Sequence, residues 1–173
     1  GPLSVSSDGS ITEQGGSSVT APSTQLTLNS ATGDVILKNA AAMGALTLTG
    51  TGHNLDLEST TQSQINSMLT GDTWASVTVV DSGAAISLPN FTATAGLNVT
   101  APGISQSAGP IAVTGGTTLS SPGNPITLTN SGNTISGNVA FTGSSVTLAS
   151  GGALSSSGTA TGGLSETAGG TIS

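Results

Sequence analysis

Asp56 and Glu58 are the acidic pair in this sequence best placed for binding chemistry. They alternate with Leu55 and Leu57, so a strand here would bury the leucines and direct both carboxylates to the same outer face. Two carboxylates arranged in this way could bind a cation or a sugar. The alternative interpretation is a solvated strand face whose charge discourages edge-to-edge aggregation.

Trp74, with Asp72 two residues before it, is the second candidate. It is the single tryptophan of the chain and lies within an irregular stretch of sequence, residues 60–76. Exposed tryptophan stacks on sugar faces or anchors interfaces. We therefore predict Trp74 and Asp72, together with the acidic pair, as candidate ligand or interface contacts. The alternative is that Trp74 covers the apolar side of a helix.

Other chemistry is limited by the residue types that the chain lacks. The chain has one histidine, His53, and no cysteine, so it cannot assemble a His/Cys transition-metal site or a thiol nucleophile. Polysaccharide-active enzymes use clustered carboxylates, often with Arg or Lys, but Lys38 is the single basic residue and the other acids are scattered. We expect no catalytic residue, metal ligand or cofactor, and no enzymatic activity.

Charge also restricts the partners of the chain. The net charge is −7, with one basic side chain, which leaves almost nothing to neutralise phosphates of nucleic acids or membrane surfaces. No apolar run approaches the roughly 18 residues of a membrane-spanning helix. We expect neither a nucleic-acid partner nor membrane insertion.

Composition and spacing together predict the fold. The chain has 173 residues, of which 28 are Ser, 28 are Thr and 26 are Gly, and aromatic residues make up 2%. Short apolar-x-apolar triplets nevertheless recur, and their spacing defines three tracks with a period of about 20 residues. The tracks contain Leu26, Leu46, Ile86, Ile104, Ile126 and Val146; Val35, Leu55, Val77, Leu97, Leu119 and Val139; and Phe91, Ile111, Ile135 and Leu154. This pattern predicts an all-β parallel β-helix, or β-solenoid, with three short strands in each coil of about 20–22 residues.

Residues 60–76 interrupt the pattern at the place where the first track expects a strand. Ile65, Met68 and Leu69 have helical spacing, and Thr61 with Gln64 could form a capping box. We predict a short helical insertion near 60–72, which replaces or decorates one face of a coil. Residues 1–4 have the sequence of an expression-tag scar, and we expect residues 5–173 to be a single solenoid segment of a larger protein.

The segments Ile104–Leu119 and Pro125–Val139 resemble the repeats of bacterial filamentous-haemagglutinin-like exoproteins, and the resemblance covers residues 90–160 best. The resemblance implies a right-handed parallel β-helix and secretion to the bacterial cell surface through an outer-membrane transporter (two-partner secretion). It also implies adhesion, aggregation or biofilm formation, with glycans, extracellular matrix or like adhesin molecules as partners. It supplies no catalytic residues.

Two other non-enzymatic functions stay open. One is a surface-layer or other structural scaffold. The other is an ice-binding solenoid, because Thr27, Thr47, Thr78, Thr127 and Thr147 each lie between inward-facing residues and point outward.

Overall fold

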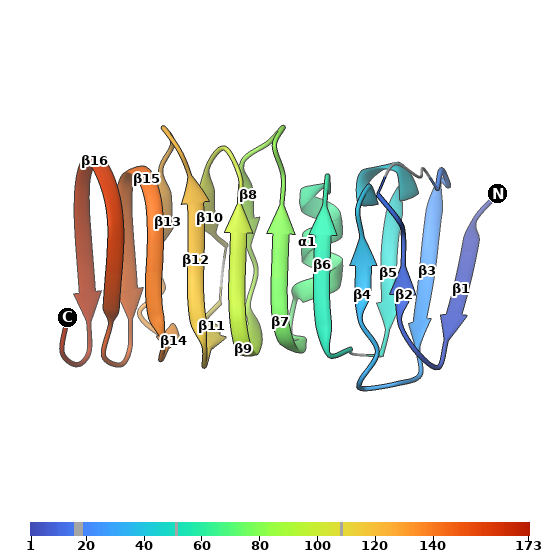
Figure 1. Ribbon diagram of the computed structural model, residues 1–173, viewed down its shortest axis with the longest axis horizontal. Helices are drawn as coiled ribbons and strands as arrows, with labels where there is room; N and C mark the ends of the chain where they lie inside the picture. Colours follow the sequence, from blue (N-terminus) through green and yellow to red (C-terminus); the bar gives the residue numbers. More distant parts are fainter. Residues whose placement is uncertain (16–18, 51, 108) are drawn as a thin grey trace.

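The chain winds into a rod of about eight stacked coils, as the computed structural model shows (Figure 1). The structure describes residues 1–15, 19–50, 52–107 and 109–173. The paired strands of successive coils run parallel to one another. The parallel β-solenoid predicted from the sequence is therefore confirmed.

The strands lie on three faces of the rod. The first face contains β1 (Leu3–Ser7), β3 (Ser23–Leu28), β5 (Ala45–Thr49), β8 (Ile86–Leu88), β10 (Ile104–Gln106) and β13 (Ile126–Leu128). The second face contains β2 (Ile11–Thr12), β4 (Val35–Leu37), β6 (Asn54–Glu58), β7 (Thr73–Val80), β9 (Phe91–Thr100) and β12 (Gly116–Ser121). The third face contains β11 (Ile111–Val113), which pairs with the start of β9 and with β14 (Thr134–Ile135).

The core is a column of mainly aliphatic side chains along the axis of the rod, and Trp74, Phe91 and Phe141 are buried among them. On the second face, Val35 pairs with Leu55, Leu55 with Val77 and Val77 with Leu97, so successive coils are 20, 22 and 20 residues long. All four side chains are buried, whereas the residues beside them in sequence point outward. Small β-branched and aliphatic residues suit this interior because each coil encloses little space.

The register differs from the predicted tracks on all three faces. On the first face Leu26 pairs with Leu48 rather than with Leu46, and on the third face Ile135 pairs with Val113 rather than with Ile111. The second face shows what such a shift does. Leu97 pairs with Thr117 rather than with Leu119, and Leu119 pairs with Val99. Because side chains alternate with a period of two, this shift keeps Leu119 inside but also places Thr117 inside. The Thr117 hydroxyl is buried and has no hydrogen-bond partner among the described residues.

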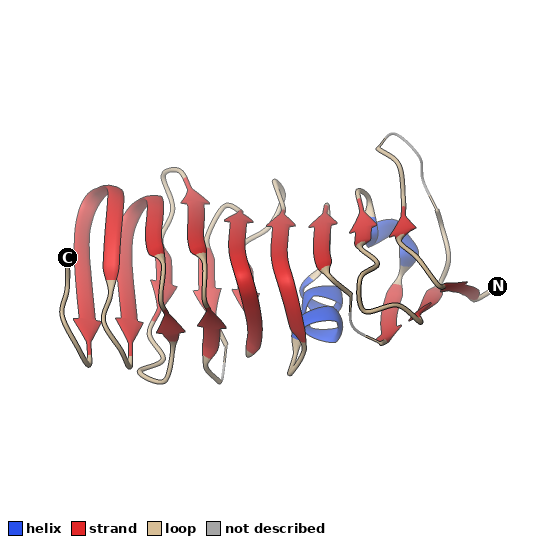
Figure 2. Ribbon diagram, turned by 60° about the horizontal axis from the view of Figure 1, so that its bottom comes forward, coloured by secondary structure: helices blue, strands red, loops and turns tan. Residues whose placement is uncertain are grey.

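The last two coils depart from the expected three short strands. β15 (Asn138–Ser150) and β16 (Ser155–Ala168) each bend around a corner and pair along both the second and the first face (Figure 2). The register shifts between Gly143 and Ser145, where an irregularity lets the strand turn. The corner therefore forms without a break in the strand.

The predicted helical insertion is present as α1 (Gln62–Leu69), with Thr61 and Gln64 forming the expected capping box. Helix α1 contacts both β5 and β8, so it fills the position of a missing strand on the first face. Ile65, Met68 and Leu69 lie on the inner side of this helix and are fully buried. A 3-10 helix, Ala40–Met43, precedes β5 and was not expected from the sequence.

Polar side chains of α1 form hydrogen bonds with backbone groups of β5 and β8, which a strand in this position would otherwise have bonded. The Gln62 amide donates to the Ser87 carbonyl at 2.6 Å and accepts from the Ser87 N–H at 2.7 Å, on β8. On the other side, the Ser67 hydroxyl donates to the Leu46 carbonyl of β5 at 2.5 Å. A helix can occupy a strand position here because these side chains replace backbone hydrogen bonds.

Among the described residues, no helix has the length and apolar character needed to cross a membrane.

Candidate functional site

The Asp56–Glu58 pair lies on the outer face of β6, as predicted, and Lys38 lies between the two carboxylates. Ile36 and Leu37 of β4 pair with Asp56 and Leu57, so Lys38, the next residue, lies beside Glu58. The Lys38 Nζ is 2.6 Å from Asp56 Oδ2 and 2.6 Å from Glu58 Oε1. The hydrogen bonds to Asp56 and then to Glu58 raise the pKa of Lys38 above its ordinary value.

This ion-pair cluster changes the chemistry available to the two acids. The side chains of Lys38, Asp56 and Glu58 are 28%, 26% and 37% exposed, so solvent still reaches all three. One ammonium group already neutralises half of the negative charge that would attract an external cation. The cluster therefore binds the chain's own cation, and a ligand at this place would have to displace it.

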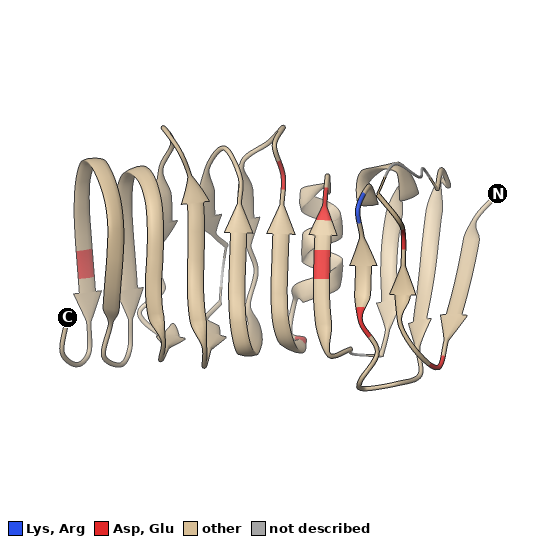
Figure 3. Ribbon diagram, viewed as in Figure 1, with Lys and Arg blue, Asp and Glu red and all other residues tan. Residues whose placement is uncertain are grey.

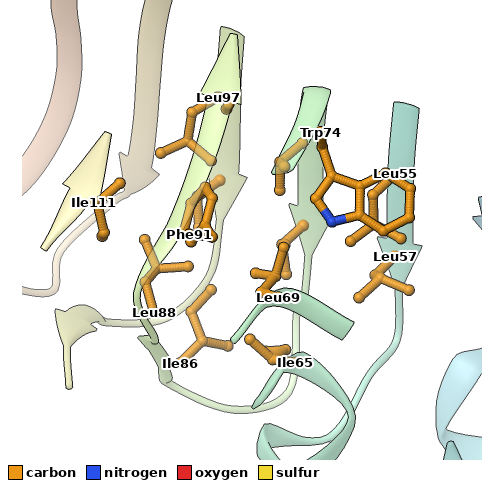
Figure 4. Close-up of a cluster of buried hydrophobic side chains, with 14 of the residues drawn as sticks. Leu55, Leu57, Ile65, Leu69, Trp74, Ile86, Leu88, Phe91, Leu97 and Ile111 are labelled. Atoms are coloured by element: carbon orange, nitrogen blue, oxygen red, sulfur yellow. The ribbon is translucent and has the colours of Figure 1, made fainter. Parts of the chain in front are cut away.

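Trp74 is at the start of β7 and points into the interior. Its side chain is 1% exposed, and its Nε1–H donates to the Met68 carbonyl at 3.3 Å. The indole ring lies beside Leu55, Leu57 and Leu69 in the core (Figure 4). This position matches the alternative stated for it, in which the ring covers α1 and the neighbouring coil. The ring has no free face on which a sugar could stack.

Asp72 lies in the turn between α1 and β7. Its backbone N–H donates to the Leu69 carbonyl, and its own carbonyl accepts from Thr92 on the next coil. Partial burial raises the pKa of the Asp72 carboxyl above its ordinary value of 3.8. The structure does not bring the four candidate residues into one site, because Asp56 and Glu58 face solvent whereas Trp74 faces the core.

His53 lies in the turn before β6 and forms polar contacts within its own coil and the preceding one. Its Nδ1 is 2.9 Å from the Asn54 amide nitrogen and 3.7 Å from Asp34 Oδ1. Asp34 also accepts from the Asn54 backbone N–H and side chain. Across the part of the chain that the structure describes, no three His, Asp or Glu side chains group as a metal site would require.

Shallow troughs on the outer second face were not anticipated from the sequence. One, of about 320 Å³, is lined by Thr78, Asn98 and Thr118 and by Gly96 and Gly116, among others. A second, also about 320 Å³, continues from Thr118 towards β16. The sequence could have indicated these troughs through the outward-facing glycines in β9 and β12. They leave space where neighbouring coils carry side chains.

Charge is distributed unevenly along the rod. The single lysine and most of the acids lie in the amino-terminal half (Figure 3). Residues 82–165 contain no Asp, Glu, Lys, Arg or His. The outer faces of β9 through β15 are therefore built from hydroxyl, amide and small apolar groups only.

Comparison with known proteins gave one family match. Residues 74–142 match a family described as "Repeats of unknown function (DUF5649)", a segment that runs from β7 into β15. No curated protein and no solved structure matched the chain. The chain is a repeat protein. The family match and the stacked coils together show this, and the closer resemblance to filamentous-haemagglutinin-like exoproteins stays a prediction.

Proposed function

We propose that this chain is a structural and adhesive segment of a large secreted bacterial surface protein and has no enzymatic activity. The repeated coils are consistent with a structural role, since a solenoid holds its faces at fixed spacing over a long distance. The observation that carries the adhesive part is the uncharged stretch 82–165, whose hydroxyl and amide groups repeat along the outer faces of successive coils.

The adhesive contacts would be weak individually and strong together. Thr78, Asn98 and Thr118 lie in register on adjacent coils, about 4.8 Å apart along the axis. A glycan or matrix polymer lying along this row would meet similar donors and acceptors at each of these three coils, before the row ends at Asp56 on one side and Ala140 on the other. Several linked contacts of this kind raise the overall affinity without any single strong site.

Attachment of chain-coated beads to immobilised glycans and extracellular-matrix proteins tests this proposal. We expect coated beads to bind or aggregate more than uncoated beads, and Asp56→Asn and Glu58→Gln to leave binding unchanged. Asn98→Asp with Thr118→Asp on the second face should weaken binding to uncharged glycans. Ser105→Asp with Thr127→Asp on the first face is the matched control. Binding lost with either single acid substitution, or no binding at all, would contradict the proposal.

Secretion forms a separate part of the proposal and has a separate test. Export by two-partner secretion requires an outer-membrane transporter, which would be the partner of the full-length protein during export. A transporter gene beside the gene for this chain would support this route. A cytosolic operon would contradict both the route and the surface location.

One observation favours ice binding as a second candidate. On the first face, Ser87, Ser105, Thr127 and Thr147 form an outward column of hydroxyls across four coils. A thermal-hysteresis measurement decides this alternative. Hysteresis that disappears in Thr127→Leu with Thr147→Leu would favour ice binding over adhesion.

A further inference from the structure

Lys38, Asp56 and Glu58 form a cluster that the proposed function does not use. One amine contacts two carboxyl groups of the neighbouring coil, since the Lys38 Nζ lies 2.6 Å from Asp56 Oδ2 and 2.6 Å from Glu58 Oε1. Lys38 is the single lysine of the chain. An amine held against one carboxyl group, with a second carboxyl group beside it to carry protons, contains the groups needed to form an amide bond.

The strand register holds the amine and the Asp56 carboxyl group together. Asp56 on β6 pairs with Ile36 on β4, and Lys38 lies two residues after Ile36, so its amine reaches diagonally across one coil boundary. The Asp56 Cγ, which the amine would attack, is bonded directly to the Oδ2 that Lys38 contacts. Well-oriented groups within one molecule react as if their concentration were about 10⁵–10⁸ M. This advantage acts against the unfavourable equilibrium of amide formation between separate groups in water.

The surroundings of Asp56 favour an uncharged product. Its Oδ1 is buried and has no hydrogen-bond partner among the described residues. A carboxylate keeps part of its negative charge on this oxygen, and burying a polar atom without a partner costs free energy. In an amide the same atom is a neutral carbonyl oxygen. Ile36, Thr78 and Val80 occupy positions in register with Asp56 and Glu58, and none of them adds a competing charge.

We propose that Lys38 and Asp56 condense into an amide bond, with Glu58 as the proton carrier, and that this bond joins the coil of β4 covalently to the coil of β6. The hydrogen bonds that raise the pKa of Lys38 keep its amine mostly protonated, so we expect the reaction to proceed slowly after the chain has folded. Such a bond goes beyond the proposed function and does not depend on it, since it fixes two coils to each other and not the rod to a partner.

The three groups supply every atom and proton of the reaction. The Lys38 ammonium transfers one proton to Asp56 Oδ2 along their hydrogen bond, which leaves a neutral amine beside a neutral carboxylic acid. The amine attacks Cγ, and Glu58 removes a second proton from Nζ as the C–N bond forms. Glu58 then delivers this proton to Oδ2, whose bond to Cγ breaks, and Oδ2 leaves as water. The third proton stays on the amide nitrogen, and Oδ1 becomes the carbonyl oxygen.

Intact mass spectrometry of the folded chain tests the bond. We expect a species that is lighter by one water and whose fraction grows during incubation, and we expect none in Lys38→Arg, which keeps the charge but does not condense. Asp56→Asn should lose ammonia instead of water, because the leaving group changes. Glu58→Gln should slow the loss by about tenfold or more, since the amide cannot carry the proton. Labelling of the single side-chain amine should fall in proportion to the water lost.

Water can also be lost at Asp8, where the carboxyl group can close a succinimide ring with the N–H of Gly9. Asp8→Ala removes this source and is the matched control, so the loss assigned to Lys38 and Asp56 should continue in it. Peptide mapping should then find the segments that contain these two residues linked to each other. A chain that keeps its full mass after prolonged incubation would overturn the proposal. So would water loss that persists in Lys38→Arg or disappears in Asp8→Ala, and an unchanged rate in Glu58→Gln would overturn the role of Glu58.

Discussion

Most individual polar residues inside this rod are tolerated because they have hydrogen-bond partners, the Thr117 and Ser121 hydroxyls being exceptions among the described residues. Asn133 is the clearest case: it is fully buried, and its Oδ1 accepts from the Ile111 N–H at 2.8 Å and from the Gln106 amide at 2.7 Å. Its Nδ2 donates to Gln106 Oε1 at 2.9 Å and to the Ala149 carbonyl at 3.2 Å. One side chain thus links the corners of three successive coils.

Replacing Asn133 by Ala should lower the free energy of unfolding by about 2–3 kcal/mol. The substitution removes the Asn133 partner of the Ile111 N–H and two hydrogen bonds of the Gln106 amide, which keeps those to Gly109 and Asn130. Loss of buried partners costs more than the loss of an exposed hydrogen bond. Asn138→Ala is the matched control: Asn138 is exposed, and we expect a change within about 0.5 kcal/mol. Equal effects of the two substitutions in urea unfolding would show that the buried network adds no stability.

The partial burial of Asp72 predicts how the stability of the folded protein changes with pH. Its folded-state pKa is raised above 3.8, so the folded protein holds this proton more tightly than the unfolded chain. The favourable contribution of Asp72 is therefore complete below pH 3.8 and is lost as the pH rises through the folded-state pKa. We expect Asp72→Asn to raise the melting temperature slightly at pH 7 and to have a smaller effect at pH 3. Asp8→Asn removes the same charge from an exposed turn and is the control. If its melting temperature changed between pH 7 and pH 3 in the same way as that of Asp72→Asn, this explanation would be contradicted.

Helix α1 is the element that departs most from the repeat, and its stability depends on one buried amide. Gln64 Nε2 donates to the Ala40 and Gly44 carbonyls at 2.7 and 2.6 Å, and its Oε1 accepts from the Thr61 N–H at 3.0 Å. The same side chain therefore completes the capping box and hydrogen-bonds α1 to the 3-10 helix Ala40–Met43 and the residue after it.

We expect Gln64→Ala to destabilise the protein by about 2–3 kcal/mol, because the buried Ala40 carbonyl, the partly buried Gly44 carbonyl and the Thr61 N–H lose their partner together. Trp74, the single tryptophan, is in contact with α1 through the Met68 carbonyl, so its fluorescence reports directly on docking of the helix. The exposed Ser63, replaced by Ala, is the control and should change stability by less than about 0.5 kcal/mol. An unchanged denaturation midpoint for Gln64→Ala would show that the amide makes no net contribution to the stability of the protein.

At the level of elements, the sequence predicts whatever depends on local periodicity. The spacing of Ile65, Met68 and Leu69 identified α1, and alternating aliphatic residues identified most strands. The register between Leu97 and Thr117 was not predictable, because a shift of two residues preserves the alternation. The burial of Trp74 and the position of Lys38 between Asp56 and Glu58 depend on contacts between coils, which a single sequence does not reveal.

At the level of the whole molecule, the rod behaves as a stack in which each coil contacts mainly its neighbours. In such an arrangement stability is approximately a sum of coil and interface contributions, so a complete coil can be removed if the register around it is preserved. The structure gives the required boundaries: Val77 pairs with Leu97 and Ser87 pairs with Ser105. Joining Ser76 directly to Leu97 would therefore place every later residue in the position of its equivalent one coil earlier.

We expect deletion of residues 77–96 to give a folded rod that is shorter by one coil, about 4.8 Å. Ser105 would take the place of Ser87 beside Gln62 of α1, so the helix would keep an edge strand to pair with. Circular dichroism should retain its β signal, and the maximum dimension from small-angle X-ray scattering should decrease. Deleting residues 77–86 alone removes half a coil, moves later strands to other faces and should abolish cooperative folding. If both deletions folded equally well, the coil period would not be the unit of stability in this protein.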